Sequence, residues 1–257
     1  MTLNQKLTAF KTILTKEFLR FIRIWIQTVL PPAIMVALYF IIFGNLIGSQ
    51  IKDIDGYTYI EYIVPGLILM SVISNSYANV VSSFFSAKFH RNIEEMIISP
   101  LPNTIILCGY ISGGIARGLI VGIAVTFVAM IFSPITIQHW FITFLVFFLT
   151  ATLFAIAGFI NAVYAKTFDD ISIVPTFILT PFTYLGGIFY SIKMLPEFWQ
   201  NISLANPILY MINAFRYGML GISDIDIVWA FVIICAFIIV LFLFALNLLN
   251  KGIGIKN

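Results

Sequence analysis

FFSAKFHRNIEEMIISPLP, at residues 84–102, is the densest run of charge between two long apolar segments of this chain. Its charged and apolar residues alternate in a way that is typical of one or two turns of amphipathic helix. The helix should end near Ser99 and Pro100, because the residue before a proline is pushed out of helical geometry. The sequence therefore predicts a short helix over about residues 86–99. A solvated loop whose charges only set the topology is the alternative.

The composition is that of an integral membrane protein. Of 257 residues, 61% are hydrophobic and only 10% are charged, whereas about a quarter of the residues in a soluble domain are charged. The whole length, residues 1–257, is expected to form a single membrane domain. The net charge of +3 is small and scattered along the chain, so a nucleic acid is not an expected partner.

Apolar segments long enough to cross a bilayer recur along the chain. A helix rises about 1.5 Å per residue and a bilayer core is about 30 Å thick, so a span needs about 20 apolar residues. The fold class predicted is therefore all-α integral membrane, with six transmembrane helices. They are expected near residues 25–47, 63–83, 105–132, 140–163, 173–191 and 227–249.

The segment before the first expected span, residues 1–23, has apolar residues at helical spacing and basic residues on another side. This pattern predicts an amphipathic helix that lies on the membrane surface. A bend is expected at Pro31 and Pro32, since proline cannot donate a helical hydrogen bond. Ten Lys and Arg residues lie on the side of the termini and of residues 84–102, and three on the other. Both termini are therefore predicted to be cytoplasmic.

The connection between the fifth and sixth expected spans is unusually apolar for a loop. Pro196 and Pro207 interrupt it. These features predict short helices over about residues 195–220 that re-enter the outer half of the membrane, where irregular backbone must be buried in protein or face water. An ordinary external loop is the alternative.

The second expected span carries Ser71, Asn75 and Asn79 on one face. Such a polar stripe is costly against lipid, so it should face either protein or a transport pathway. Hydrogen bonding between helices and contact with cargo both explain it. Arg117 lies near the middle of the third span, where a guanidinium needs a partner or water. Backbone carbonyls, the polar stripe and a bound anionic group are the candidates.

A ridge of small residues marks the third expected span. Gly114, Gly118 and Gly122 recur at every fourth position, which lets another helix approach closely. We interpret this ridge as a packing surface rather than a binding site.

Motifs for catalysis are missing from the sequence. There is no Gly-x-x-x-x-Gly-Lys-Ser/Thr phosphate loop, so this chain should not hydrolyse nucleotide by itself. The two histidines, His90 and His139, are not placed as a pair, and Cys108 and Cys235 lie apart within apolar segments. No catalytic, cofactor-binding or metal-binding residue is therefore predicted.

Two parts of the sequence together resemble a known family. KFHRNIEEMIISPLPNTIILCGYISGGIARG at residues 88–118 is the first, and the second comprises LGGIFY at 185–190, Leu195-Pro196 and NPILYMINAFR at 206–216. Over nearly the whole length, the chain resembles the permease subunits of ABC-2 type exporters of bacterial inner membranes. The resemblance implies two permeases, a homodimer in the simplest case, driven by two cytoplasmic ATPase subunits that hold ATP and Mg²⁺. Its cargo would be a lipid-linked glycan, a polysaccharide or a hydrophobic drug.

The resemblance also implies roles for particular residues. Residues 86–99 match a coupling helix that seats in a groove of the ATPase, with Ile93, Met96 and Ile97 filling the groove. The residues that match the family's ATPase-coupling segment are Arg91, Glu94, Glu95, Ser99 and Pro100. Those that match its outer signature, whose role is unassigned, are Pro207, Tyr210 and Arg216. A membrane anchor that recruits a cytoplasmic partner through residues 86–102 without transport is the alternative function.

Overall fold

A computed structural model describes residues 1–48, 50 and 53–254 of the chain. Within these residues the secondary structure is helical, and an isolated bridge between Ile54 and Tyr57 is the only strand-like pairing. Five of the described helices are long and apolar enough to cross a membrane. The prediction of an all-α membrane protein is confirmed.

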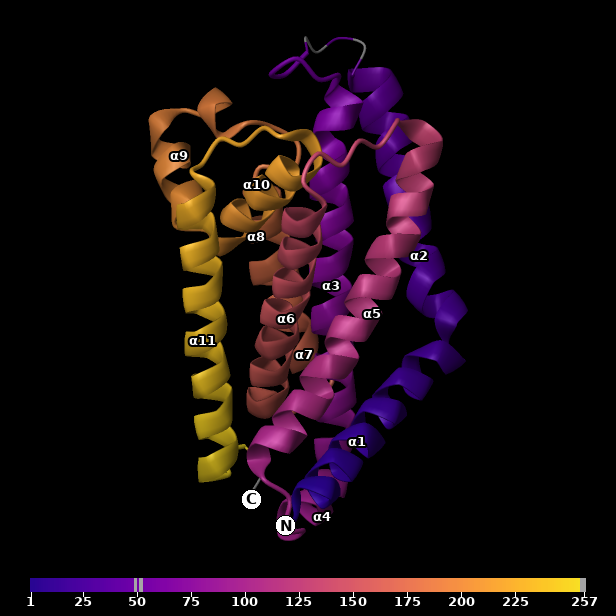
Figure 1. The fold of residues 1–257 in the computed structure, drawn as a ribbon, viewed down its shortest axis with the longest axis vertical. Helices are drawn as coiled ribbons and strands as arrows, with labels where there is room; N and C mark the ends of the chain where they lie inside the picture. The colour runs from indigo at the N-terminus through magenta and orange to yellow at the C-terminus, as the bar shows by residue number, and fades with distance from the viewer. Residues whose placement is uncertain (49, 51–52, 255–257) are drawn as a thin grey trace.

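The chain begins with a helix that lies outside the main bundle. Helix α1 (Leu3–Arg23) starts with a capping box, in which the side chains of Thr2 and Gln5 each accept a hydrogen bond from the other's backbone amide. Its direction changes at Ile24, where α2 (Trp25–Tyr39) begins (Figure 1). Helix α2 runs through both prolines and continues as a π-helix, η1 (Phe40–Ile47). The first expected span is thus α2 followed by η1.

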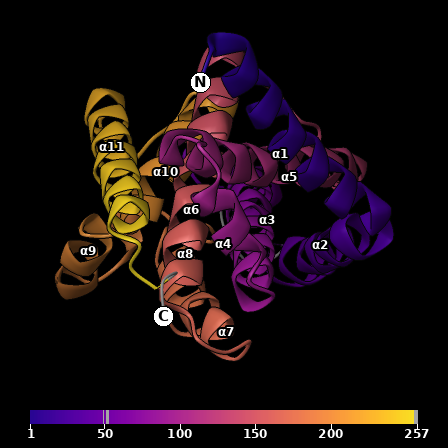
Figure 2. The same ribbon diagram turned by 90° about the horizontal axis from the view of Figure 1, so that it is seen from below.

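Four long helices follow: α3 (Tyr59–Phe89), α5 (Asn103–Phe132) and α6 (Trp140–Tyr164), which pack on one another, and α11 (Ile227–Lys251), which lies at the edge of the molecule (Figure 1). Helix α3 is the most buried and α11 the least. Seen from the end that carries α4, α3 lies between α1 and α2 on one side and α6 on the other (Figure 2). Because α3 contacts protein over most of its surface, its polar residues lie inside the bundle.

The fifth expected span is shorter than predicted. It consists of α7 (Asp170–Val174), the π-helix η2 (Pro175–Leu179) and α8 (Thr180–Tyr184). The helix ends before residue 191 because Gly187 adopts a left-handed conformation, with φ of 77°, that side chains rarely allow. This segment is too short to be among the five long candidate spans.

Short helices fill the connection that follows. These are the 3-10 helix η3 (Ile192–Met194), α9 (Glu197–Leu204) and α10 (Pro207–Leu220). Helix α10 is buried and packs against α6, α11 and α3. Helix α9 lies beside the start of α11, at the opposite end of the bundle from α4, the N-terminus and the end of α11 (Figure 1).

The glycine ridge of α5 faces α3 and α6. A Cβ atom on Gly114 would lie 2.9 Å from the Cβ of Ala155 and 3.0 Å from the carbonyl oxygen of Ser76. On Gly118 a Cβ would meet the side chain of Ser76, and on Gly122 the ring of Phe147. The three helices therefore approach at distances that only glycine permits on α5.

Candidate functional site

The charged segment between α3 and α5 contains a separate helix, α4 (Asn92–Ile98). Residues 86–89, predicted as part of this helix, belong to the last turn of α3. The break falls at Arg91, whose φ of 60° is the left-handed value that ends a helix. Only His90 and Arg91 separate the two helices, so α4 is held close to the end of α3.

One side of α4 packs against the protein itself. Ile93 is only 1% exposed and belongs to the hydrophobic core, with Met96 partly buried beside it. The hydroxyl of Tyr110 on α5 lies 4.0 Å from the sulfur of Met96. Ile93 is therefore not available to a partner's groove, contrary to the expectation from the resemblance. The side chain of Ile97 lies outside the described part of the structure.

The other side of α4 is open. Arg91, Glu94, Glu95 and Pro100 are exposed, and Ile98 is 84% exposed. An isolated apolar side chain flanked by charges, as here, is the kind of group that anchors a protein contact. The exposed set of residues 91, 94, 95, 98 and 100 is called the α4 surface below.

Ser99 has a structural position at the end of α4. Its hydroxyl donates to the carbonyl oxygen of Met96 at 2.6 Å, and its backbone amide donates to that of Glu95 at 3.1 Å. These bonds satisfy carbonyls that a helix C-terminus leaves free. Ser99 is half-buried, in contrast to the neighbouring Pro100.

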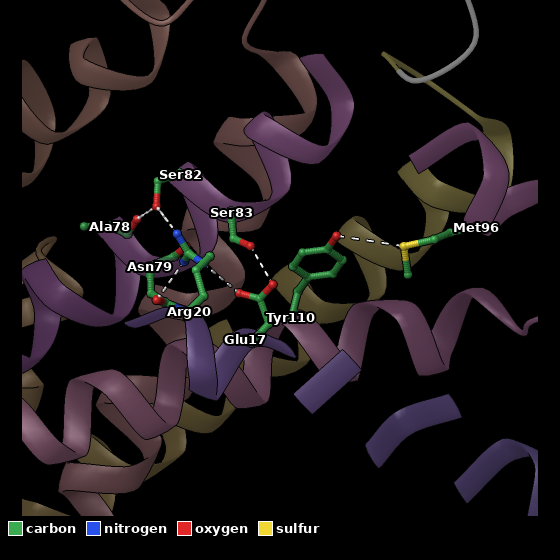
Figure 3. Close-up of polar contacts among 8 residues, drawn as sticks. All are labelled: Glu17, Arg20, Ala78, Asn79, Ser82, Ser83, Met96 and Tyr110. Atoms are coloured by element: carbon green, nitrogen blue, oxygen red, sulfur yellow. Dashed lines mark hydrogen bonds and ion pairs between the residues drawn. The ribbon is translucent and has the colours of Figure 1, made fainter. Parts of the chain in front are cut away.

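A buried charged cluster, which the sequence patterns do not predict, joins α1 to α3 (Figure 3). Glu17 is fully buried, and its Oε1 accepts a hydrogen bond of 2.6 Å from the hydroxyl of Ser83. Its Oε2 lies 3.5 Å from Nε of Arg20. Nη2 of Arg20 donates to the backbone oxygen of Asn79 at 2.8 Å and to its Oδ1 at 2.9 Å, and Nη1 lies 3.4 Å from the hydroxyl of Ser82.

The signal for this cluster is present in the sequence. Glu17 lies four residues from both Ile13 and Phe21, so it occupies the apolar face of α1. A lone acid on an apolar face needs a partner, because a buried charge is costly unless it is paired. Helix α1 therefore packs its apolar face on α5 and is joined to α3 by hydrogen bonds, instead of resting on lipid alone.

The polar stripe of α3 contacts other helices. The hydroxyl of Ser71 donates to the carbonyl oxygen of Leu67 in its own helix at 3.1 Å. Oδ1 of Asn75 accepts a hydrogen bond of 3.2 Å from Nη2 of Arg117, and one turn further Asn79 accepts from Arg20. Arg117 is thus held by the stripe, one of its three expected partners. Two arginines lie along α3, with Glu17 as the only carboxylate in contact with either among the described residues.

The outer signature ties α10 to its neighbours. Pro207 is the first residue of α10, and the hydroxyl of Tyr210 donates to the carbonyl oxygen of Leu204 in α9 at 2.7 Å. Arg216 is 1% exposed. Its Nη2 donates to the carbonyl oxygen of Gly187 at 2.6 Å, and its guanidinium lies 3.9 Å from the centre of the Tyr62 ring. Arg216 therefore lies inside the protein and not in an exposed loop.

The connection between α6 and α7 lies close to α4. Oδ2 of Asp170 accepts hydrogen bonds from the backbone amides of Lys166 at 2.8 Å and Thr167 at 2.9 Å. These bonds favour the ionised carboxylate and lower the pKa of Asp170 below its ordinary value. The carboxylate fixes the turn that leads into α7.

Groups of His, Cys, Asp and Glu side chains able to hold a metal ion do not occur among the described residues. Cys108 is half-buried, Cys235 is exposed, and neither forms a disulfide. The polar residues described above either connect one helix to another or lie on the exposed side of α4.

The sequence matches the ABC-2 type transporter family over residues 8–220. The chain therefore belongs to this family and is an ABC-2 permease of a transporter system. It is 55% identical over 249 residues to the inner membrane transport permease YadH of Escherichia coli K12, which covers 97% of both chains. It is also 23% identical over 212 residues to nodulation protein J of Rhizobium leguminosarum bv. viciae, which covers 81% of both chains.

Proposed function

We propose that this chain is the transmembrane permease of an ATP-driven exporter and that a separate cytoplasmic ATPase, which holds ATP and Mg²⁺, docks on the α4 surface. The observation that carries this proposal is the division of α4 into two sides. Ile93 fixes one side to the permease core, and Glu94, Glu95 and Ile98 leave the other open. A docking element that is rigidly attached to its own protein can transmit a partner's motion.

The connections of α4 support transmission into the membrane. Two residues join it to α3, and the short segment at residues 99–102 joins it to α5. Rigid-body closure of a paired ATPase would therefore tilt α3 and α5 together, whereas a flexible loop would absorb the motion. The Glu17 cluster would extend the same motion to α1, because Glu17 and Arg20 are bonded to α3.

The proposal places the permease in a bacterial inner membrane with both termini cytoplasmic. The excess of Lys and Arg near the termini and α4 supports this orientation, and the name of the YadH relative supports the location. In this arrangement the α7–η2–α8 segment acts as a sixth, short span. Helices α9 and α10 would then re-enter from the outer side, with α10 buried in protein as the hydrocarbon region requires.

Two copies of the chain would form the pathway as a homodimer. Its cargo is proposed to be a lipid-linked glycan, a polysaccharide or a hydrophobic drug, the cargo classes that the family resemblance implies. Arg117 and the polar stripe are proposed to contribute either to that pathway or to packing within it. Cargo screening in vesicles follows once coupling has been established.

ATP hydrolysis tests the proposal. A candidate ABC ATPase would be assayed alone, with the permease in lipid, and with the Glu94→Lys/Glu95→Lys permease. We expect the native permease to change the hydrolysis rate and the charge-reversed form to have little effect. Glu197→Lys, an exposed acid on α9 at the other end of the bundle, is the matched control and should behave as the native protein.

The opposite result has a clear meaning. If the hydrolysis rate is the same with and without the permease, the exporter proposal is wrong. If, in addition, a cytoplasmic protein binds through residues 86–102 in the native chain, the non-transporting anchor takes its place.

A further inference from the structure

A cavity of about 590 Å³ lies beside α4, where α3 and α6 end. Three cationic residues from three different elements line it: Lys88 from α3, Arg91 from the junction with α4, and Lys166 from the connection after α6. Glu94 is the acidic residue in the lining. The lining therefore carries a net positive charge at one end of the helix bundle.

Lys88 is held in place by the end of α6. Its ammonium group donates to the carbonyl oxygens of Val163 at 2.6 Å, Ala165 at 2.7 Å and Ala162 at 3.5 Å. These are carbonyls at a helix C-terminus, where partial negative charge accumulates. Lys88 thereby contributes a charge in a defined position and closes the inner side of the cavity.

Arg91 and Lys166 are not neutralised in the same way. Both side chains are exposed, and the two ion pairs found among the described residues involve neither of them. Arg91 has a left-handed backbone at the end of α3. Within the described ranges, two cations thus border the cavity without a carboxylate in salt-bridge contact.

The remaining lining is aromatic and apolar. Phe85 and Phe89 line the cavity beside the cations. The ring of Phe168 lies against both, 4.9 Å from Phe85 and 5.0 Å from Phe89 between ring centres. Phe89 is 56% exposed and Phe168 is 52% exposed. Phe85 is buried, so the exposed phenylalanines beside the cations are Phe89 and Phe168. Cations next to such exposed rings at a helix end form a surface for an amphiphile, with its charge at one side and its apolar part at the other.

We propose that this cavity binds the phosphate headgroup of an anionic phospholipid, with Arg91 and Lys166 as its main ligands and the phenylalanines against the glycerol and upper acyl chain. Basic pockets between transmembrane helices suit such headgroups, and a guanidinium can donate two hydrogen bonds to one phosphate. A free phosphate ion would use the same cations but would leave the phenylalanines uncovered. The lipid is therefore the better match to the whole lining.

This inference goes beyond the proposed export function and does not depend on it. Lipid binding is measured on the permease without any ATPase, so either proposal can fail alone. The site shares Arg91 with the α4 surface and places Glu94 at its border. A bound anionic lipid would thus lie next to the residues proposed to contact the ATPase.

The test uses the purified full-length permease in detergent. Native mass spectrometry and thermal unfolding would be compared after addition of phosphatidylglycerol, phosphatidylcholine or inorganic phosphate. We expect only phosphatidylglycerol to be retained and to raise the melting temperature. Each cation near a membrane surface contributes about fivefold to anionic lipid binding, so Arg91→Asn/Lys166→Gln should weaken retention about 25-fold. Lys11→Gln, an exposed cation on α1, should leave retention unchanged.

Three outcomes would overturn the inference. Equal retention of phosphatidylcholine would show that the cavity does not select anionic headgroups. Unchanged phosphatidylglycerol binding by the double variant would place the lipid elsewhere. Stabilisation by inorganic phosphate as large as that by the lipid would make the cavity a site for free anions.

Discussion

The carboxylate of Glu17 lies buried at the contact between α1 and α3, 2.6 Å from the hydroxyl of Ser83. Helix α1 therefore joins the bundle through a polar bond as well as through its apolar face. Removal of one partner from a buried charged pair leaves the other without compensation. Glu17 thus contributes to the stability of the α1 contact together with the packing of α1 on α5.

The variant Glu17→Ala should lower the free energy of unfolding by about 3 kcal/mol. Arg20, whose side chain is 31% exposed, can turn to water. The loss of stability should therefore lie at the lower end of the range for broken buried ion pairs. Unfolding by denaturant in a lipid-like detergent measures the change. Glu17→Gln keeps a hydrogen-bond acceptor for Ser83 and should lose less; equal losses would show that the bond to Ser83 is unimportant.

Ile93 and Ile98 of α4 should respond in opposite ways. Ile93→Ala removes a buried side chain and should cost about 2–5 kcal/mol of stability. Ile98→Asp changes a side chain that is 84% exposed, so the melting temperature should change little. Its effect should appear as a loss of ATPase binding in co-purification. Normal ATPase binding by Ile98→Asp would argue against the α4 surface as the docking site.

Arg216 should not tolerate replacement by lysine. Its guanidinium bonds to Gly187 and lies over the Tyr62 ring, and an ammonium cannot reproduce both the planar stacking and the forked donors. We expect Arg216→Lys to lower stability by about 2 kcal/mol, mostly through the lost cation–π contact and unsatisfied buried donors. Thermal unfolding measures this. Arg23→Lys, the same change at an exposed position, should have almost no effect.

Asp170 should make the α6–α7 turn sensitive to acid. Backbone amides lower its folded-state pKa below the ordinary value of 3.8. Its stabilisation is therefore fully present above the unfolded pKa and is lost as the pH falls through the lower, folded pKa. The difference in melting temperature between the native protein and Asp170→Asn should shrink as the pH is lowered from 6 to about 3. Asp169→Asn, at a neighbouring exposed acid, should show no such trend.

The helical architecture is predictable because a membrane restricts the choices. Long apolar segments must satisfy their backbone hydrogen bonds internally, so length and hydropathy locate most spans. Their ends are less predictable. The left-handed residue Arg91 ends α3, and a turn that contains the left-handed Gly187 follows the end of α8. Apolar residues continue beyond Gly187, so hydropathy alone does not locate the end of α8. Hydropathy likewise does not predict the π-helical turns in η1 and η2.

The candidate site is predictable in location but not in orientation. Charge density correctly marks α4 as a helix, and the resemblance marks its acids. Periodicity over seven residues cannot tell which apolar residues face the bundle. Ile93, expected to fill a partner's groove, is buried in the permease, whereas Ile98, to which the sequence assigns no role, is exposed. For Arg117 the sequence offers the polar stripe as one of three candidate partners and does not choose among them. The pairing of Arg20 with Asn79 requires the position of α1, which no local pattern contains.

The two-sided packing of α4 has a consequence for how such permeases can diverge. The residues that hold the helix in place and those that face outward alternate within seven positions. Under the proposed docking on the α4 surface, a change at Glu94, Glu95 or Ile98 would alter which ATPase is recognised without repacking of the helix bundle. Partner choice and transmembrane architecture would then be separable properties, and a new pairing could arise by surface substitutions alone.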